Sequence, residues 1–264
     1  MKQVLKQDRT EKIVCLGDEI TYGHRPEWSD ATWRPLKMSL MRVRQYFDYD
    51  PHEEMPVIIW IGGGAFTHSD KNVWAPEMTY FAKRGFIVAS IDYSSEGRAR
   101  FPMMLEDIKL GIRYLRAHAK DFHIDPDRMV IMGESAGAYL ASLVALTGEE
   151  RKYDVGEYQE YSSAVSAAIS LYGCTKRVVM EGGRIDLPEL MPMVTEKTPP
   201  FLMFHGTGDK VVSCTESEAL YDELQKHGVP SDLYLIEDAN HADCPMYQPA
   251  IKDMIIEFIH KVIG

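Results

Sequence analysis

The chain has 264 residues, of which 45% are hydrophobic and 26% are charged, and this ordinary balance excludes a disordered or low-complexity chain. A chain of this length buries about three quarters of its unfolded surface, so it needs no disulfide or metal to hold a core. Its 29 Lys and Arg against 40 Asp and Glu give a formal net charge of −11, which repels phosphate backbones and anionic lipid, so we expect neither nucleic acid nor membrane as a partner.

Other sequence signals also indicate a soluble protein. No apolar segment reaches the roughly 20 residues of a transmembrane helix, and the N-terminal MKQVLKQDRTEKIV lacks the apolar core of a signal peptide. The four cysteines (Cys15, Cys174, Cys214 and Cys244) are too few and too scattered for a disulfide scaffold or a zinc pattern. We expect a cytoplasmic protein with no metal and no cofactor. Its oligomeric state and a pairing of Cys214 with Cys244 stay open.

Strand patterns recur along the chain. Residues 36–43 alternate imperfectly between apolar and polar side chains, which is typical of a half-exposed antiparallel strand. Residues 57–61 form a continuous apolar run between Pro56 and three glycines, as expected for a parallel strand that is buried on both faces. The same signature recurs at 86–91, 129–132, 164–171, 201–204 and 233–236.

Segments with helical spacing separate these strands, at 104–115, 136–146, 216–224 and 251–262. Strands that alternate with helices of this length predict a parallel sheet with helices on both faces. Because we find no internal repeat and no linker, we expect residues 1–264 to form one domain. Residues 175–199 follow neither period and are predicted to be a surface excursion.

The most informative motif is GESAG at 133–137, which lies between an apolar strand and an Ala-rich helix. A strand that turns into a helix within a few residues leaves no room for Cβ atoms, so glycines flank Ser135. Such a turn exposes the serine hydroxyl at the carboxyl edge of the sheet. The adjacent helix N-terminus favours a developing negative charge. The pattern predicts that Ser135 is a nucleophile.

A serine hydroxyl is a poor nucleophile, so it needs a base and a group that orients the base. Asp209 follows an apolar strand in a Gly-rich turn, and His241 follows the next strand. The carboxyl ends of parallel strands share one edge of the sheet, so both side chains are expected to meet Ser135 there. We assign His241 as the base and Asp209 as the acid that holds it.

Three other residues near these strands are alternatives for the same roles. His205 also lies at a strand end, but it precedes the acid and is expected to be structural. Asp238 is too close to His241 in sequence to reach its far nitrogen. Asp243 lies two residues beyond His241 and is a candidate to support the histidine without contacting the substrate.

The segment WIGGGAF, which follows the first central strand, predicts an oxyanion hole. Small residues let backbone N–H groups face a substrate oxygen without intervening side chains. Gly63, Gly64 and Ala65 are the candidate donors in this loop, and Ala136, directly after the nucleophile, is the other. A phosphate-binding loop is disfavoured because the Lys and Ser or Thr of that motif are missing.

In these motifs the chain resembles the α/β-hydrolase carboxylesterases of the HGGG-type lipase/esterase branch, and within it small bacterial acetyl xylan and feruloyl esterases. WIGGGAF is similar to the family's W-I-H-G-G-[GA]-F, with Gly62 in place of the usual histidine. GESAG matches the nucleophile elbow, GTGDKVV at 206–212 the acid loop, and Asn240-His241 the histidine loop. The likeness runs from about residue 55 to the C-terminus and implies the same triad, with Gly64, Ala65 and Ala136 as the likeliest oxyanion donors.

The resemblance implies an α/β-hydrolase fold: a mostly parallel central sheet with antiparallel N-terminal strands, helices on both faces and a small lid or none. It also implies a serine carboxylic ester hydrolase that acts through an acyl-enzyme. The short 175–199 segment favours acetyl or other short acyl groups, on sugars or phenolics, over the esters of a long-chain lipase. Five side chains would lie near the sheet edge and are candidates for substrate contacts or for packing: Phe66, Glu134, Tyr172, Val211 and Met246.

Two alternatives stay open at this point. An amidase, formamidase or small peptidase could use the same three residues. A ligand-binding protein on an inactive hydrolase fold would typically lack one of them, whereas all three positions are filled here. A serine at position 135 disfavours the aspartate-dependent dehalogenases and the cysteine-dependent dienelactone hydrolases.

Overall fold

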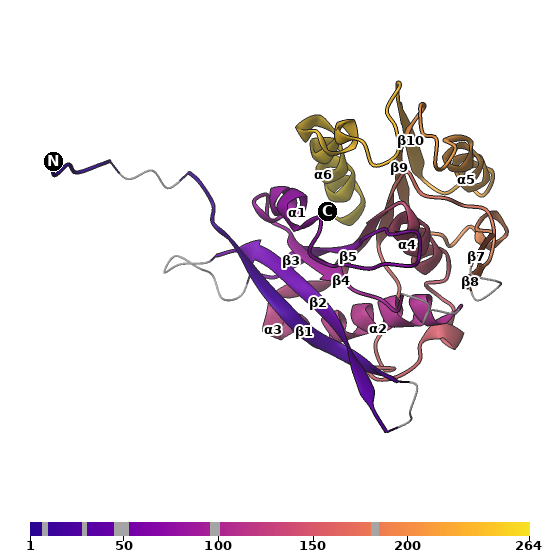
Figure 1. The fold of residues 1–264 in the computed structure, drawn as a ribbon, viewed down its shortest axis with the longest axis horizontal. Helices are drawn as coiled ribbons and strands as arrows, with labels where there is room; N and C mark the ends of the chain where they lie inside the picture. The colour runs from indigo at the N-terminus through magenta and orange to yellow at the C-terminus, as the bar shows by residue number, and fades with distance from the viewer. Residues whose placement is uncertain (7–9, 28–30, 45–52, 96–100, 181–184) are drawn as a thin grey trace.

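The computed structural model describes residues 1–6, 10–27, 31–44, 53–95, 101–180 and 185–264. Its centre is an eight-stranded sheet with the order β1-β2-β4-β3-β5-β6-β9-β10 (Figure 1). β1 pairs antiparallel with β2 and β2 pairs antiparallel with β4, while all further neighbours are parallel. The strands are β1 (Val14–Pro26), β2 (Trp33–Val43), β3 (Met55–Ile61), β4 (Ile87–Ile91), β5 (Ile124–Glu134), β6 (Ala167–Leu171), β9 (Phe201–Gly206) and β10 (Ser231–Ile236).

Helices cover both faces of the sheet, as predicted. α2, α4 and α5 contribute to one buried apolar cluster, and α1 and α6 contribute to another across the sheet. Figure 1 shows α1 and the C-terminal α6 near each other above the parallel strands. The helices are α1 (Ala75–Ala82), α2 (Met103–Ala117), α3 (Ala119–Phe122), α4 (Ala136–Leu146), α5 (Thr215–Lys226) and α6 (Pro249–Ile263).

The alternation of side chains along a strand explains why the central strands read as unbroken apolar runs. In β3, Val57 and Ile59 belong to the cluster under α2 and α4, whereas Ile58 and Trp60 belong to the cluster under α1 and α6. Successive side chains of a strand point to opposite faces, so a strand with helices on both sides must be apolar at every position.

Three differences from the sequence predictions concern β1, β2 and α1. β1 was not predicted, because it is an edge strand whose side chains are mostly exposed and show no apolar alternation. β2 begins at Trp33, three residues before the expected start. α1 was also missed, since it has only eight residues and too few turns to show a period.

The excursion at 175–199 is more buried than predicted. It contains a short hairpin of β7 (Val178–Met180) and β8 (Ile185–Leu187). Leu187, Leu190 and Val194 from this segment are buried in the same apolar cluster as α4. The prediction of a surface excursion is therefore wrong for its second half, which is held by the core. No helix among the described residues combines the length and the apolar character needed to cross a bilayer.

Candidate active site

The predicted nucleophile lies in a sharp turn between a strand and a helix. β5 ends at Glu134, α4 begins at Ala136, and Ser135 between them has φ 52° and ψ −122°. A positive φ is unfavourable for a residue with a Cβ atom and persists only where its surroundings hold it. The Ser135 N–H donates to the carbonyl of Leu171 at 3.0 Å, which ties the turn to the end of β6.

Close backbone contacts require the two glycines that flank Ser135. A Cβ atom at Gly137 would lie 2.1 Å from the carbonyl oxygen of Ile61, and one at Gly133 would lie 2.4 Å from the carbonyl oxygen of Gly137. In both cases the obstacle is backbone, which cannot move aside as a flexible side chain can. The glycines of GESAG therefore let β3, β5 and α4 approach one another at the nucleophile.

Gly137→Ala is expected to lower the free energy of unfolding by about 3 kcal/mol or more, because overpacking against fixed atoms is costly. Gly111→Ala is a matched control: its Cβ would lie closest to the end of the Ile91 side chain, at 2.8 Å, and its other near neighbours are side-chain atoms in ordinary contact. We expect that variant to stay within about 1 kcal/mol of the wild type. Urea unfolding measures both. Equal stability of the two variants would contradict the close contact at Gly137.

Ser135, His241 and Asp209 come together at the carboxyl ends of three parallel strands. The Ser135 Oγ lies 2.9 Å from Nε2 of His241, and Nδ1 of His241 lies 2.7 Å from Oδ2 of Asp209. A carboxylate can only accept, so Nδ1 carries the ring hydrogen and Nε2 is left to accept the serine hydroxyl. The Asp209 side chain is fully buried, while the His241 side chain retains 14% exposure. This arrangement can deprotonate the serine and hold the resulting imidazolium.

The loop after β9 fixes the carboxylate of Asp209. Its Oδ1 accepts the N–H groups of Val211 and Val212 at 2.8 and 2.9 Å. Burial raises the pKa of Asp209, but the hydrogen bond from His241 and those from the two valine amides outweigh burial and bring the pKa below its ordinary value. The acid is therefore ionised at neutral pH.

This lowered pKa makes the folded state sensitive to acid. An Asp whose pKa is lower when folded stabilises the protein above its unfolded pKa of about 4, and that contribution is lost as the pH falls further. The stability of the wild type relative to Asp209→Asn is expected to decrease when urea unfolding is followed from about pH 6 to pH 3. A difference that stays constant over this range would contradict the lowered pKa.

His205 supports the acid, in line with its expected structural role. It is fully buried, with Nε2 3.0 Å from the Val212 carbonyl oxygen and 3.2 Å from Oδ2 of Asp209. Nδ1 lies 2.7 Å from the Ser217 hydroxyl. Because Nε2 faces only acceptors, it carries the hydrogen, and Ser217 donates to Nδ1. Burial lowers the pKa of His205, which favours this neutral form.

The glycine loop after β3 has an unusual backbone. Gly64, Ala65 and Phe66 have φ values of 125°, 51° and 63°. The carbonyl of Gly64 accepts the N–H groups of Thr67 and His68 at 3.0 and 3.1 Å, which closes the loop on itself. Among the described residues, the N–H groups of Gly64, Ala65 and Ala136 form no hydrogen bond.

Gly63 differs from its neighbours in this loop. Its N–H donates to Oε1 of Glu134 at 2.5 Å, so it is not free to bind a substrate oxygen. The prediction that Gly63 donates to an oxyanion is therefore corrected: a side chain 71 positions away in sequence takes its hydrogen bond. The preceding carbonyl, that of Gly62, accepts the Tyr93 hydroxyl at 3.0 Å, and this bond holds the loop at the position where the HGGG-type pattern has its histidine.

Four of the five side chains considered for substrate contacts or for packing are buried in this structure, which favours packing or a supporting position. Phe66 is 4% exposed and meets the Tyr139 ring edge-on, with ring centroids 5.6 Å apart. Tyr172, fully buried, lies edge-on against the His241 ring at 4.9 Å. The remaining three are Met246, buried in the cluster under α6, Glu134, described below, and Val211, which is exposed beside Asp209.

Sequence reasoning missed two aromatic residues at this edge of the sheet. Trp74 precedes α1 and stacks on Tyr247, with ring centroids 4.4 Å apart and planes at 15°. The Tyr247 hydroxyl is hydrogen-bonded to that of Tyr172. Both lie in loops that follow parallel strands, and that location is the signal that could have singled them out.

The loop that carries His241 is held by hydrogen bonds to the side chain of Asp243. Asp243 accepts the N–H groups of Asn240 and Cys244 at 3.1 and 2.8 Å, which fits the supporting role considered for it.

All four cysteines are free thiols. Across the ranges that the structure describes, no cluster of three His, Cys, Asp or Glu side chains could hold a metal ion.

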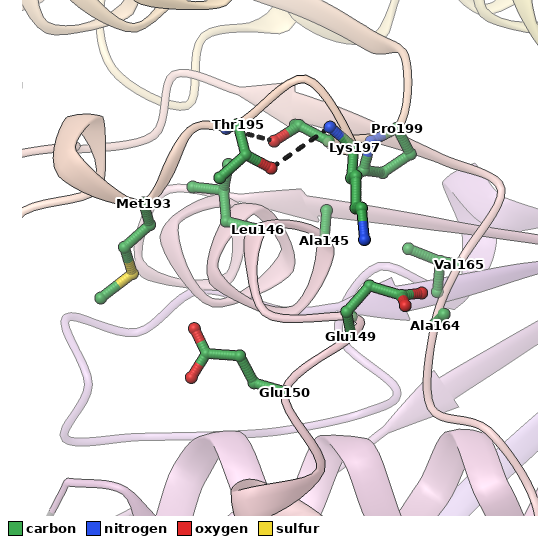
Figure 2. A pocket seen from close by; sticks show the side chains of 12 residues that line it. Ala145, Leu146, Glu149, Glu150, Ala164, Val165, Met193, Thr195, Lys197 and Pro199 are labelled. Carbon is green, nitrogen blue, oxygen red and sulfur yellow. Dashed lines mark hydrogen bonds between the residues drawn. The ribbon is translucent and has the colours of Figure 1, made fainter.

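A cavity of about 270 Å³ lies away from these residues (Figure 2). Ala145 and Leu146 at the C-terminal end of α4 form part of its wall, and Lys197 and Glu149 also line it. Ser135 precedes the opposite end of this 11-residue helix, which is about 16 Å long. The cavity is thus separate from the candidate active site.

Comparisons with known proteins agree with this description. The BD-FAE family matches residues 45–186, more than half of the chain, a range that includes Ser135 and ends before Asp209. Esterase LipQ of Mycobacterium tuberculosis is 31% identical over 239 residues, which cover 81% of this chain and 56% of that protein. Isoprenylcysteine alpha-carbonyl methylesterase ICME of Arabidopsis thaliana is 28% identical over 79% of this chain and 56% of that protein. The chain spans a little over half the length of these curated relatives.

Solved structures show the same fold over nearly the whole chain. A truncated form of a carbohydrate esterase from gut microbiota has a TM-score of 0.80 at 18% identity, covering 96% of this chain and 98% of that one. Esterase 2 of Thermogutta terrifontis has a TM-score of 0.76 at 22% identity, over 92% and 94% of the two chains. The strand order, the nucleophile elbow and these matches together lead to one conclusion: the chain is a member of the BD-FAE family and has the α/β-hydrolase fold.

Proposed function

We propose that the chain hydrolyses carboxylic esters through an acyl-enzyme formed on Ser135. The observation that carries this proposal is the continuous hydrogen-bonded line from Ser135 through His241 to Asp209, with distances of 2.9 and 2.7 Å. It supplies a nucleophile, a general base and an ionised group that orients the base. The esterase names of the relatives point to the same chemistry.

In the first half of the proposed reaction, the Ser135 Oγ bonds to the ester carbonyl carbon while Nε2 of His241 takes the hydroxyl proton. The carbonyl electron pair moves to its oxygen, which the free N–H groups of Gly64, Ala65 and Ala136 are placed to stabilise. The bond to the alcohol oxygen then breaks, and the imidazolium returns its proton to that oxygen. Asp209 stabilises the imidazolium throughout.

In the second half, water attacks the acyl carbon and gives its proton to Nε2 of His241. The same N–H groups stabilise the second tetrahedral oxyanion. Ser135 leaves as its Oγ regains a proton from the imidazolium, and the carboxylic acid is released. No residue ends in a changed protonation state, so the cycle can repeat.

We propose short acyl groups, such as acetyl or small aryl acyl groups on sugars or phenolics, as the substrates. The 175–199 segment supports this, because its second half is held in the core by Leu187, Leu190 and Val194 and leaves little chain to cover a long acyl group. A carbohydrate esterase among the structural neighbours points the same way.

Hydrolysis of nitrophenyl esters of increasing chain length tests the proposal, with nitroacetanilide as the matching amide. We expect the acetate and butyrate to be hydrolysed at least about tenfold faster than a long-chain ester, and the amide to be far slower than the acetate. Comparable rates on the aryl ester and the aryl amide would favour an amidase instead. An absence of hydrolysis on every ester would contradict the proposal.

A further inference from the structure

Glu134 is a buried carboxylate directly before the nucleophile, and the chemistry proposed above does not use it. It is the last residue of β5, and it is 6% exposed, so it offers little surface to a substrate. Its Oε1 accepts the Gly63 N–H at 2.5 Å and the indole N–H of Trp74 at 3.2 Å. Glu134 thus connects the nucleophile elbow to the glycine loop.

The fit between Glu134 and Gly63 is close enough to fix the loop. A Cβ atom at position 63 would lie 2.5 Å from Oε1 of Glu134 and 2.9 Å from its carbonyl oxygen. The glycine therefore lies directly against both the side chain and the backbone of Glu134. On the other side, the Tyr93 hydroxyl holds the carbonyl of Gly62. The peptide group between Gly62 and Gly63 is therefore held at both its carbonyl and its N–H. The chain then enters the turn that carries the free N–H groups of Gly64 and Ala65.

The carboxylate is well suited to hold a backbone N–H at this position. Burial raises the pKa of Glu134 above its ordinary value, although the hydrogen bonds from Gly63 and Trp74 oppose that rise. A buried carboxyl group is tolerated only when its oxygens have partners, and here the loop itself supplies one. The hydrogen bond is thus part of what keeps both the glutamate and the loop in place.

We propose that Glu134 is a positioning residue for the oxyanion hole: by holding the Gly63 N–H, it orients the following N–H groups of Gly64 and Ala65 toward the acyl oxygen. The inference rests on the proposed ester hydrolysis. Its physical basis is that an oxyanion donor acts only at hydrogen-bond distance from the oxygen that becomes charged. A small movement of the loop therefore lowers kcat more than it weakens substrate binding.

Two substitutions separate the reach of the side chain from its charge. Glu134→Gln keeps the length and an accepting oxygen, while Glu134→Asp keeps the charge and shortens the side chain by one methylene. We expect kcat of Glu134→Gln to stay within about threefold of the wild type, and kcat of Glu134→Asp to fall by about 10- to 100-fold with KM little changed. A general loss of stability would not lower kcat of Glu134→Asp while sparing that of Glu134→Gln. It would also not lower kcat while leaving KM little changed.

Glu216→Asp is the matched control. Glu216 also accepts a backbone N–H, that of Thr175 at 2.8 Å, but it lies on α5 and holds the excursion rather than the glycine loop. Its kcat is expected to stay within about twofold of the wild type. Thermal unfolding of all variants confirms that kcat is compared between folded proteins.

Hydrogen exchange of residues 62–68 gives a readout that does not need activity. We expect faster exchange of the Gly63 amide in Glu134→Asp than in Glu134→Gln or the wild type. If the wild type hydrolyses no ester, the proposed function fails while exchange still tests the loop contact. If the wild type is active but Glu134→Asp keeps its kcat, or Glu134→Gln loses as much as Glu134→Asp, the inference about Glu134 is overturned and the proposed function stands.

Discussion

Replacing Ser135 with alanine is expected to lower kcat/KM for nitrophenyl acetate by about 10⁴- to 10⁶-fold. Alanine leaves no oxygen to bond to the acyl carbon, so His241 and Asp209 have no nucleophile to activate. The residual rate would come from the oxyanion donors and substrate binding alone. Initial rates, compared at equal enzyme concentration after removal of any contaminating esterase, measure the effect.

Ser142→Ala is the matched control for this variant. Ser142 lies seven residues, or about two helical turns, beyond Ser135 inside α4, and its side chain is buried. We expect Ser142→Ala to keep its activity within about threefold of the wild type and both variants to unfold cooperatively. If Ser135→Ala retained most of the wild-type turnover, Ser135 could not be the nucleophile.

The second large effect is expected at the acid. Asp209→Asn should lower kcat at neutral pH by about 10⁴-fold. An asparagine amide can donate to Nδ1 of His241, which would place the ring hydrogen on Nε2 and leave nothing to accept the Ser135 proton. Because Oδ1 also accepts two backbone N–H groups, an asparagine oxygen can take that place and the loop can keep its shape.

Asp238→Asn tests the alternative acid. Asp238 is exposed and precedes His241 by three residues. It has a φ of 57°, which asparagine tolerates. We expect kcat of this variant within about threefold of the wild type. A drop in Asp238→Asn as large as that in Asp209→Asn would show that the acid had been assigned to the wrong loop.

The parts of this structure that the sequence could predict are those with a local signature. A strand buried on both faces, such as β3, is apolar at each position, and a tight strand-to-helix turn needs glycines around Ser135. The positions of Asp209 and His241 followed from one topological fact, that parallel strands end at the same edge. These features depend on a few neighbouring residues, so they can be predicted without knowledge of tertiary contacts.

The parts that could not be predicted depend on residues distant in sequence. Which N–H of the glycine loop is free depends on Glu134, since that side chain takes the N–H of Gly63. Phe66 and Tyr172 were placed at the correct edge, but their burial depends on Tyr139 and His241, which pack against them. An edge strand such as β1, exposed and without alternation, carries no local pattern at all.

Labelling with a serine-reactive fluorophosphonate, followed by peptide mass spectrometry, tests the central claim most directly. The reagent is attacked only by an activated serine, and its phosphoryl oxygen occupies the oxyanion hole. We predict one adduct per chain, located on Ser135, absent in Ser135→Ala and formed far more slowly in His241→Ala. No adduct on the folded wild-type protein, or an adduct on a different residue, would contradict the account.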